Sequence, residues 1–229
     1  MDGGGHMWKY EDSLANSFMS MSSQKSTASD AVMREPRRQR GRDRVAALLQ
    51  AGAAVFAERG YEATTMTEVA SRAGASIGSL YQFFPGKEAL ADALLAGYGE
   101  QVLTGLRAVE AQAAQLAVPA LADALIDLLV GLKEERAAAL VLFEVRRDVA
   151  QPLRLRDDMR EGVARILVLR APGLPPDRAM AMAIVVLLQM KAAAALGTEP
   201  GLKPRDAALA ELRRMTRLYL VEGLGPDQA

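Results

Sequence analysis

From Arg42 onward the apolar residues of the chain recur every three or four positions, a spacing typical of α-helices that bury one face. Short breaks rich in glycine or proline separate these periodic segments, as at residues 171–176. Alanine and leucine dominate and aromatic residues make up only 5% of the chain, which favours helix over sheet. Because no segment alternates as a half-buried strand does, the sequence predicts an all-α fold.

The positions of the breaks predict nine helices. We expect them over residues 42–59, 65–73, 77–84, 87–115, 119–132, 134–148, 152–170, 177–196 and 205–222. Residues 1–36 lack a sustained period and are rich in glycine, serine and polar side chains, so we expect a poorly ordered tail there. No repeat of a helical solenoid is visible.

The residue types exclude several classes of chemistry. The chain has no cysteine and a single histidine, His6, which leaves no disulfide, no thiolate metal site and no histidine acid–base pair. The pair Gly86-Lys87 is followed by Glu88, not by the serine or threonine of a phosphate-binding loop. We therefore expect no metal, no cofactor and no enzymatic activity.

The net charge of the chain is zero, but its distribution is uneven. Six arginines and two acidic residues lie between Arg34 and Arg44, a local excess of four positive charges. A basic stripe before the first helix can follow a DNA backbone or enter a minor groove, and Arg42 is one of its members.

The membrane and export signals are weak. The longest uncharged apolar run that we identify, Ala179–Leu188, is shorter than the roughly 20 residues of a membrane span. The N-terminal residues contain acidic groups and no apolar segment of the kind that signal peptides carry. We expect a cytoplasmic protein without a membrane partner.

Residues 65–84 form the most informative unit of the chain. Thr65-Met66-Thr67-Glu68 is a capping box that starts a short helix, Gly74 suits a tight turn, and Ser76 can cap the next helix. Two short helices joined by a glycine-containing turn are typical of a helix-turn-helix motif. The same spacing also occurs in ordinary all-α cores, so spacing alone leaves both readings open.

The second helix of this unit has the chemistry of a DNA reader. Its N-terminal end carries three residues with small side chains that allow close approach to DNA: Ser76, Gly78 and Ser79. Tyr81 and Lys87 supply a hydroxyl and a cation, both good phosphate ligands. Gln82 lies one turn beyond Ser79 and can read an adenine edge.

The stretch from Gly60 to Leu90, GYEATTMTEVASRAGASIGSLYQFFPGKEAL, closely resembles the DNA-binding signature of the TetR family of bacterial transcriptional regulators, within a match from about Arg42 to Leu94. The resemblance implies a homodimer with an N-terminal three-helix DNA-binding domain and a larger helical domain that binds an inducer and dimerises. We accordingly expect a tail over residues 1–36, a helix-turn-helix domain over 37–86 and a ligand-binding and dimerisation domain over 87–229.

The resemblance also assigns residues of the DNA-binding helix pair. It implies phosphate contacts by Thr65, Ser76, Tyr81 and Lys87. It implies a base-facing edge made of Ile77, Gly78, Ser79 and Gln82. Two positions depart from the family pattern: Ile77 stands where lysine is common, and Phe83 stands where histidine is common. We therefore expect thymine-methyl packing at Ile77 in place of a cationic contact.

The C-terminal half has no comparable motif. Residues 177–196 are apolar on most faces, which favours a four-helix dimer interface with residues 205–222 over a central helix in a monomer. Expected wall residues of an inducer pocket are Leu103, Leu125, Leu129, Phe143, Met159, Met182 and Gln189. Their low polarity indicates an apolar inducer.

Taken together, these features predict a repressor that binds double-stranded, pseudo-palindromic operator DNA as a homodimer and is released by a small molecule. The alternative is an all-helical carrier of small molecules, or an interaction module, whose DNA-binding head no longer functions.

Overall fold

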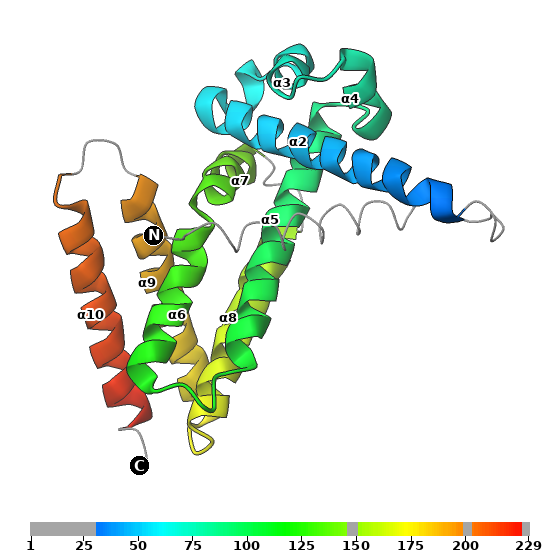
Figure 1. Ribbon diagram of the computed structural model, residues 1–229. Helices are drawn as coiled ribbons and strands as arrows, with labels where there is room; N and C mark the ends of the chain where they lie inside the picture. Colours follow the sequence, from blue (N-terminus) through cyan, green and yellow to red (C-terminus); the bar gives the residue numbers. More distant parts are fainter. Residues whose placement is uncertain (1–30, 146–150, 199–202, 226–229) are drawn as a thin grey trace, which may run out of the picture. The chain divides into compact units, whose positions relative to one another are not determined.

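The computed structural model describes residues 31–145, 151–198 and 203–225, which form nine α-helices and no strand (Figure 1). The helices are α2 (Ala31–Ala63), α3 (Met66–Arg72), α4 (Ile77–Phe83), α5 (Lys87–Glu110), α6 (Val118–Gly131), α7 (Lys133–Val145), α8 (Gln151–Arg170), α9 (Pro176–Thr198) and α10 (Arg205–Leu224). The prediction of an all-α fold is confirmed.

The chain divides into two compact units. The first comprises residues Met1–Gly97 and Ala138–Val145, and the second comprises Tyr98–Ala137 and Arg146–Ala229. Helices α2 to α4 therefore lie in the first unit, and α6 and α8 to α10 lie in the second. The functional boundary at residues 86 and 87 stays a prediction, because compactness alone does not define where a function begins.

Helix α2 is the scaffold of the first unit. Its buried side chains include Val45, Leu48, Val55 and Phe56, which the helical spacing had placed on one face. The helix begins at Ala31, earlier than expected and inside the segment assigned to the tail, of which residues 1–30 lie outside the described part. The regular helix breaks at Gly60, whose φ of 77° suits a residue without a Cβ atom.

Helices α3 and α4 both begin at a side-chain cap. The Thr65 hydroxyl oxygen accepts a hydrogen bond from the backbone N–H of Glu68, and the Ser76 hydroxyl oxygen accepts one from Ser79, each at 3.2 Å. The expected return bond of the capping box is wrong: the Glu68 carboxylate forms an ion pair with Arg59, 3.2 Å away. An arginine at the end of α2 attracts this carboxylate more strongly than a neutral backbone N–H does.

The turn between α3 and α4 depends on Gly74. Its φ of 61° lies in the left-handed region that L-residues with side chains rarely occupy. The N–H of Gly74 donates to the Ser71 carbonyl, and the N–H of Ala75 donates to the Ala70 carbonyl. These bonds close the end of α3 and direct the chain into the cap of α4.

Helix α9 is the central helix of the second unit. It packs against α6, α8 and α10, and α10 also packs against α6. Ala183, Val186, Leu187 and Met190 are among its buried residues. Because three neighbours cover it, α9 carries apolar side chains around most of its circumference.

The same composition makes α9 long and apolar enough to cross a membrane. Residues Pro176–Leu196 meet that test by length and hydropathy, with half of the window buried inside the structure. The uncharged apolar run Ala179–Leu188 lies inside this window and is shorter than it, so that run alone does not reveal the candidate. A buried helix at the centre of a helical bundle passes the same test.

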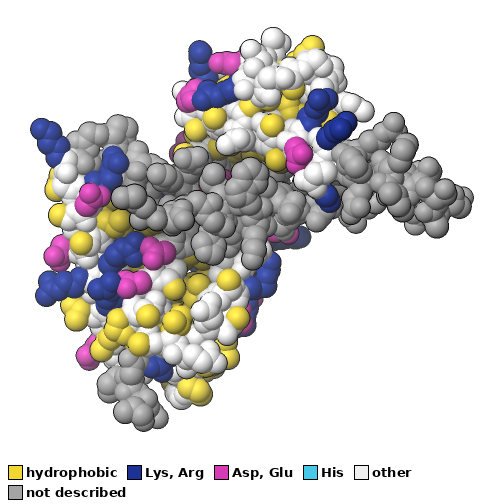
Figure 2. All heavy atoms as spheres, in the orientation of Figure 1, with side chains coloured by type: hydrophobic (Ala, Val, Ile, Leu, Met, Phe, Trp, Pro, Cys, Tyr) yellow, Lys and Arg dark blue, Asp and Glu magenta, His cyan; other side chains and the backbone are white. Residues whose placement is uncertain are grey.

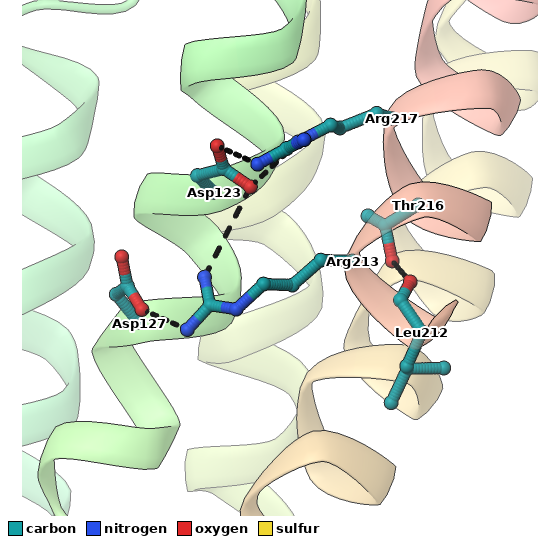
Figure 3. Close-up of polar contacts among 6 residues, drawn as sticks. All are labelled: Asp123, Asp127, Leu212, Arg213, Thr216 and Arg217. Atoms are coloured by element: carbon teal, nitrogen blue, oxygen red, sulfur yellow. Dashed lines mark hydrogen bonds and ion pairs between the residues drawn. The ribbon is translucent and has the colours of Figure 1, made fainter. Parts of the chain in front are cut away.

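Ion pairs join α6 to α10 on the surface of the second unit (Figure 3). Arg217 donates from Nε and Nη2 to the two carboxylate oxygens of Asp123, at 2.9 and 2.7 Å. Arg213 pairs with Asp127 and also approaches Asp123. Between the two arginines, the buried Thr216 hydroxyl donates to the Leu212 carbonyl at 2.9 Å. The pairs align α10 along α6.

Candidate DNA-binding surface

One face of α4 anchors the helix and the other is open to solvent. Leu80 and Phe84 are fully buried, whereas the Tyr81 side chain between them is 49% exposed. The expected DNA-facing residues share the open side: Ser76, Ile77, Gly78 and Gln82 are exposed, and Ser79 is half-buried. Because the buried Leu80 and Phe84 fix the position of α4, the helix presents its exposed side without local rearrangement.

The two cap residues combine a structural and a binding capacity. Thr65 and Ser76 are both exposed, and each hydroxyl oxygen is used as the acceptor in its cap. A hydroxyl that accepts in this way still has its hydrogen, which can donate to a phosphate oxygen. The starts of α3 and α4 can therefore both bind DNA backbone without losing their caps.

Arg44 brings a positive charge to the exposed edge of α4. Its Nη1 atom lies 3.4 Å from the Ser79 hydroxyl, across a separation of 35 residues in the sequence. Arg42, the arginine singled out from the sequence, is half-buried and donates instead to Gln39. The basic stripe signalled this charge, and the structure shows that Arg44 is a member of it that contacts Ser79.

Lys87 is held at the junction of α2 and α5. Its ammonium donates to the backbone carbonyls of Tyr61 at 2.8 Å and Glu62 at 3.2 Å. It also lies 4.5 Å from the centre of the Tyr61 ring, which in turn stacks on Phe56. The lysine therefore stabilises the end of α2, and its contact with phosphate, made through the remaining N–H, stays a prediction.

Charged and neutral surfaces alternate on the first unit. On the face that Figure 2 shows, lysine and arginine side chains stand at separate places, with uncharged atoms between them. Such a surface suits DNA, because cations can neutralise phosphates while the neutral edge of a helix meets the bases.

The expected pocket residues lie on helices of both units. Leu125 and Leu129 of α6, Met159 of α8, and Met182 and Gln189 of α9 are buried, and Leu103 of α5 is half-buried, all in the second unit. Phe143 belongs to the first unit. Helices α6 and α8 both pack on α9, so five of these residues belong to one packed group of helices. A cavity lined by the set stays a prediction.

Gln189 is unusual among these residues because it is polar and buried. Its Oε1 atom has no hydrogen-bond partner among the residues that the structure describes. An amide oxygen in this position is an available acceptor.

A capped helix pair with an exposed second helix, supported by a long first helix and followed by a helical unit, defines a helix-turn-helix DNA-binding protein of the regulator class. A family model described as "Bacterial regulatory proteins, tetR family" matches residues 48–94. A second, "Tetracyclin repressor-like, C-terminal domain", matches residues 117–220. The chain belongs to the TetR family of bacterial transcriptional regulators, as its sequence motif predicted.

Curated relatives match the DNA-binding head. The HTH-type transcriptional repressor KstR2 of Mycobacterium tuberculosis (strain ATCC 25618 / H37Rv) is 51% identical over 51 residues, which are 22% of this chain and 26% of the relative. KstR2 of Rhodococcus jostii (strain RHA1) is 41% identical over 64 residues, 28% of this chain and 31% of the relative. The matched segments thus span less than a third of either relative.

Solved structures match over both units at low sequence identity. A regulatory protein in the TetR family from Rhodococcus RHA1 has 21% identity and a TM-score of 0.59, covering 81% of this chain and 98% of that chain. The ketosteroid transcriptional regulator KstR2 of Mycobacterium tuberculosis has 22% identity and a TM-score of 0.54, covering 81% and 96%. These similarities establish the shared fold.

Proposed function

We propose that the protein is a cytoplasmic, non-enzymatic repressor that binds a pseudo-palindromic operator as a homodimer and leaves it when a small molecule binds its C-terminal unit. The observation that carries the proposal is the exposed edge of α4, with Tyr81 open to solvent above the buried Leu80 and Phe84. Curated relatives of this head are repressors by name.

In this proposal the residues of the head divide into two roles. Ile77, Gly78, Ser79 and Gln82 face the bases, and Gln82 reads an adenine edge through its amide. The contacts to phosphate come from hydroxyl and cationic groups: Thr65, Ser76, Tyr81, Lys87, Arg42 and Arg44. Their number makes binding strongly dependent on salt concentration.

The dimer forms in this proposal through an exposed apolar surface on α9 and α10. Six large side chains of these helices remain exposed in the single chain: Ile184, Val185, Leu188, Met215, Leu218 and Val221. We refer to these six residues as the α9–α10 apolar surface. Its members recur at helical spacing on each helix, so two copies can form a four-helix interface.

The effector in this proposal is a small molecule whose larger part is apolar and contacts the buried leucines and methionines of the second unit. Its effect on DNA depends on its differential affinity for the DNA-bound and the released arrangement of the dimer. By linkage, operator DNA lowers the affinity for the effector by the same factor.

Fluorescence anisotropy against the DNA upstream of the protein's own coding region tests the proposal. The wild type, Tyr81→Phe and Tyr81→Ala are titrated at two salt concentrations, with a scrambled duplex as the control. We expect sequence-selective binding that weakens with salt, is reduced in Tyr81→Phe and is lost in Tyr81→Ala.

The alternative outcomes are distinct. Equal binding to the scrambled duplex would reduce the head to a non-specific basic surface. Absence of binding to this duplex and to a genome-wide selected pool would favour the alternative function, a helical carrier with a non-functional head.

A further inference from the structure

The second unit contains a buried cation that forms no ion pair with the residues that the structure describes. Arg136 of α7 is only 8% exposed, and its guanidinium donates to the backbone carbonyl of Lys191 at 3.3 Å. Among the residues that the structure describes, no carboxylate forms an ion pair with Arg136. A buried charge that lacks a counter-charge is costly, so such a residue needs a reason to be there.

Lys191 of α9 shares the same surroundings. Its side chain is half-buried, and burial lowers the pKa of its ammonium, with the charges of Arg156, Arg160 and Arg136 lowering it further. Among the residues that the structure describes, no acidic group is a main cause that raises this pKa. We call Arg136, Arg156, Arg160 and Lys191 the cationic cluster.

Among the residues that the structure describes, one ion pair involves these four cations. In the described part of the chain, Asp157 pairs with Arg160 at 2.9 Å and is itself largely exposed. Burial raises the pKa of Tyr98 of α5, Arg136 lowers it, and the exposed Glu135 raises it. Among the described residues, no ion pair neutralises Arg136, Arg156 or Lys191.

The cationic cluster lies where several helices of the second unit come together. The Arg136–Lys191 bond joins α7 to α9, and α8 packs along α9. Helix α5 lies close to α8 near Leu155: a Cβ atom added to Gly99 would stand 3.5 Å from the Leu155 side chain. Burial raises the pKa of the neighbouring Tyr98 hydroxyl, so this group remains a neutral hydrogen-bond donor at physiological pH.

Such an arrangement fits an oxyanion. A carboxylate or phosphate placed between Arg136 and Lys191 would relieve the repulsion among the four cations, and guanidinium groups can bind both oxyanions through two parallel hydrogen bonds. The buried Leu155 and Met159 of α8 lie in the same segment as Arg156 and Arg160, with the exposed Asp157 and Asp158 between them.

We propose that the cationic cluster binds the anionic group of the effector, a carboxylate or a phosphate ester, while the apolar part of the effector contacts the neighbouring leucines and methionines. The inference rests on the proposed effector-binding function and changes its ligand class from apolar to amphipathic and anionic.

Thermal unfolding without DNA tests the proposal with small anions as probes. Inorganic phosphate and acetate are compared with chloride at constant ionic strength, for the wild type, Lys191→Met and Arg136→Gln. Arg178→Gln, an exposed cation of α9, is the matched control for net charge, and Arg44→Gln controls for anions bound at the head.

We expect phosphate, acetate or both to raise the melting temperature of the wild type and of both controls. The expected rise is about 3–6 °C at an anion concentration about tenfold above its Kd. Whichever anion acts identifies the head group as phosphate or carboxylate. Lys191→Met should lose this shift, and its anion-free protein should melt higher than the wild type because one repulsive charge is gone. Arg136→Gln should bind the anion at least tenfold more weakly in calorimetric titration.

Equal anion shifts in the wild type and in Lys191→Met would overturn the proposal, even if Arg136→Gln fails to fold. An anion-free Lys191→Met protein that melts lower than the wild type would also contradict it, because Lys191 would then be structural. Failure of operator binding with the anion shift intact would refute the regulator role and leave the site standing.

Discussion

Truncation of Leu188 and Leu218 should dissociate the proposed dimer. In the single chain these side chains are 61% and 60% exposed, more than the other large apolar residues of α9 and α10. Burial of a whole leucine side chain contributes about 1.5–3 kcal/mol, so covering three fifths of it contributes about 1–2 kcal/mol. In an isologous interface each substitution acts twice, which gives about 2–4 kcal/mol per dimer.

This free energy corresponds to a dissociation constant of the dimer about 30-fold to 1,000-fold weaker for Leu188→Ala or Leu218→Ala. Sedimentation equilibrium over a range of protein concentrations measures that constant. Leu169→Ala is the matched control, because Leu169 is 46% exposed on α8, outside the α9–α10 apolar surface. Circular dichroism should show an unchanged fold, since the substituted side chains are mostly exposed.

If the dimer dissociation constants of Leu188→Ala and Leu218→Ala both lie within threefold of the wild-type constant, this surface is not the interface. If Leu169→Ala dissociates the dimer instead, the interface involves α8.

Three further predictions concern the head and the cationic cluster. Gly74→Ala should lower the free energy of unfolding by about 1–2 kcal/mol, because the turn needs a φ of 61° and the added methyl meets no other atom; an unchanged denaturant midpoint would contradict this. Lys87→Ala should lower the melting temperature of the protein and weaken its binding to all duplexes alike, reducing the slope of log affinity against log salt concentration by about one. Gln82→Ala should instead alter the sequence preference, and anisotropy with single-base operator variants separates the two effects. The pKa of Lys191 lies below its ordinary value of 10.5, so the unfolded chain binds that proton more tightly and stability should rise with pH between the lowered pKa and 10.5. Denaturant titrations of Lys191→Met across that pH window should lack this rise, and an identical slope would refute the assignment.

Much of the candidate DNA-binding surface could be predicted from the sequence. The caps at Thr65 and Ser76 and the turn at Gly74 arise from contacts within a few residues, and each is present in the structure. The capping box failed only where a longer-range partner, Arg59, competed for the Glu68 carboxylate. Local preference holds until a stronger distant partner is available.

Other features of the site depended on packing. No local pattern placed Arg44 beside Ser79 in preference to another arginine of the stripe, and none indicated that Lys87 would bind the carbonyls of Tyr61 and Glu62. Both contacts join residues more than 20 positions apart.

The sequence by itself determined the helices, their caps and the family, because 3.6-residue periodicity, Gly and Pro breaks and cap chemistry act over a few residues. Only the tertiary structure decided which distant groups meet: the Arg217 guanidinium with the Asp123 carboxylate across 94 positions, and the Arg136 guanidinium with the Lys191 backbone carbonyl across 55. Such pairs depend on which helix faces adjoin, and that is decided by the packing of the whole second unit around α9.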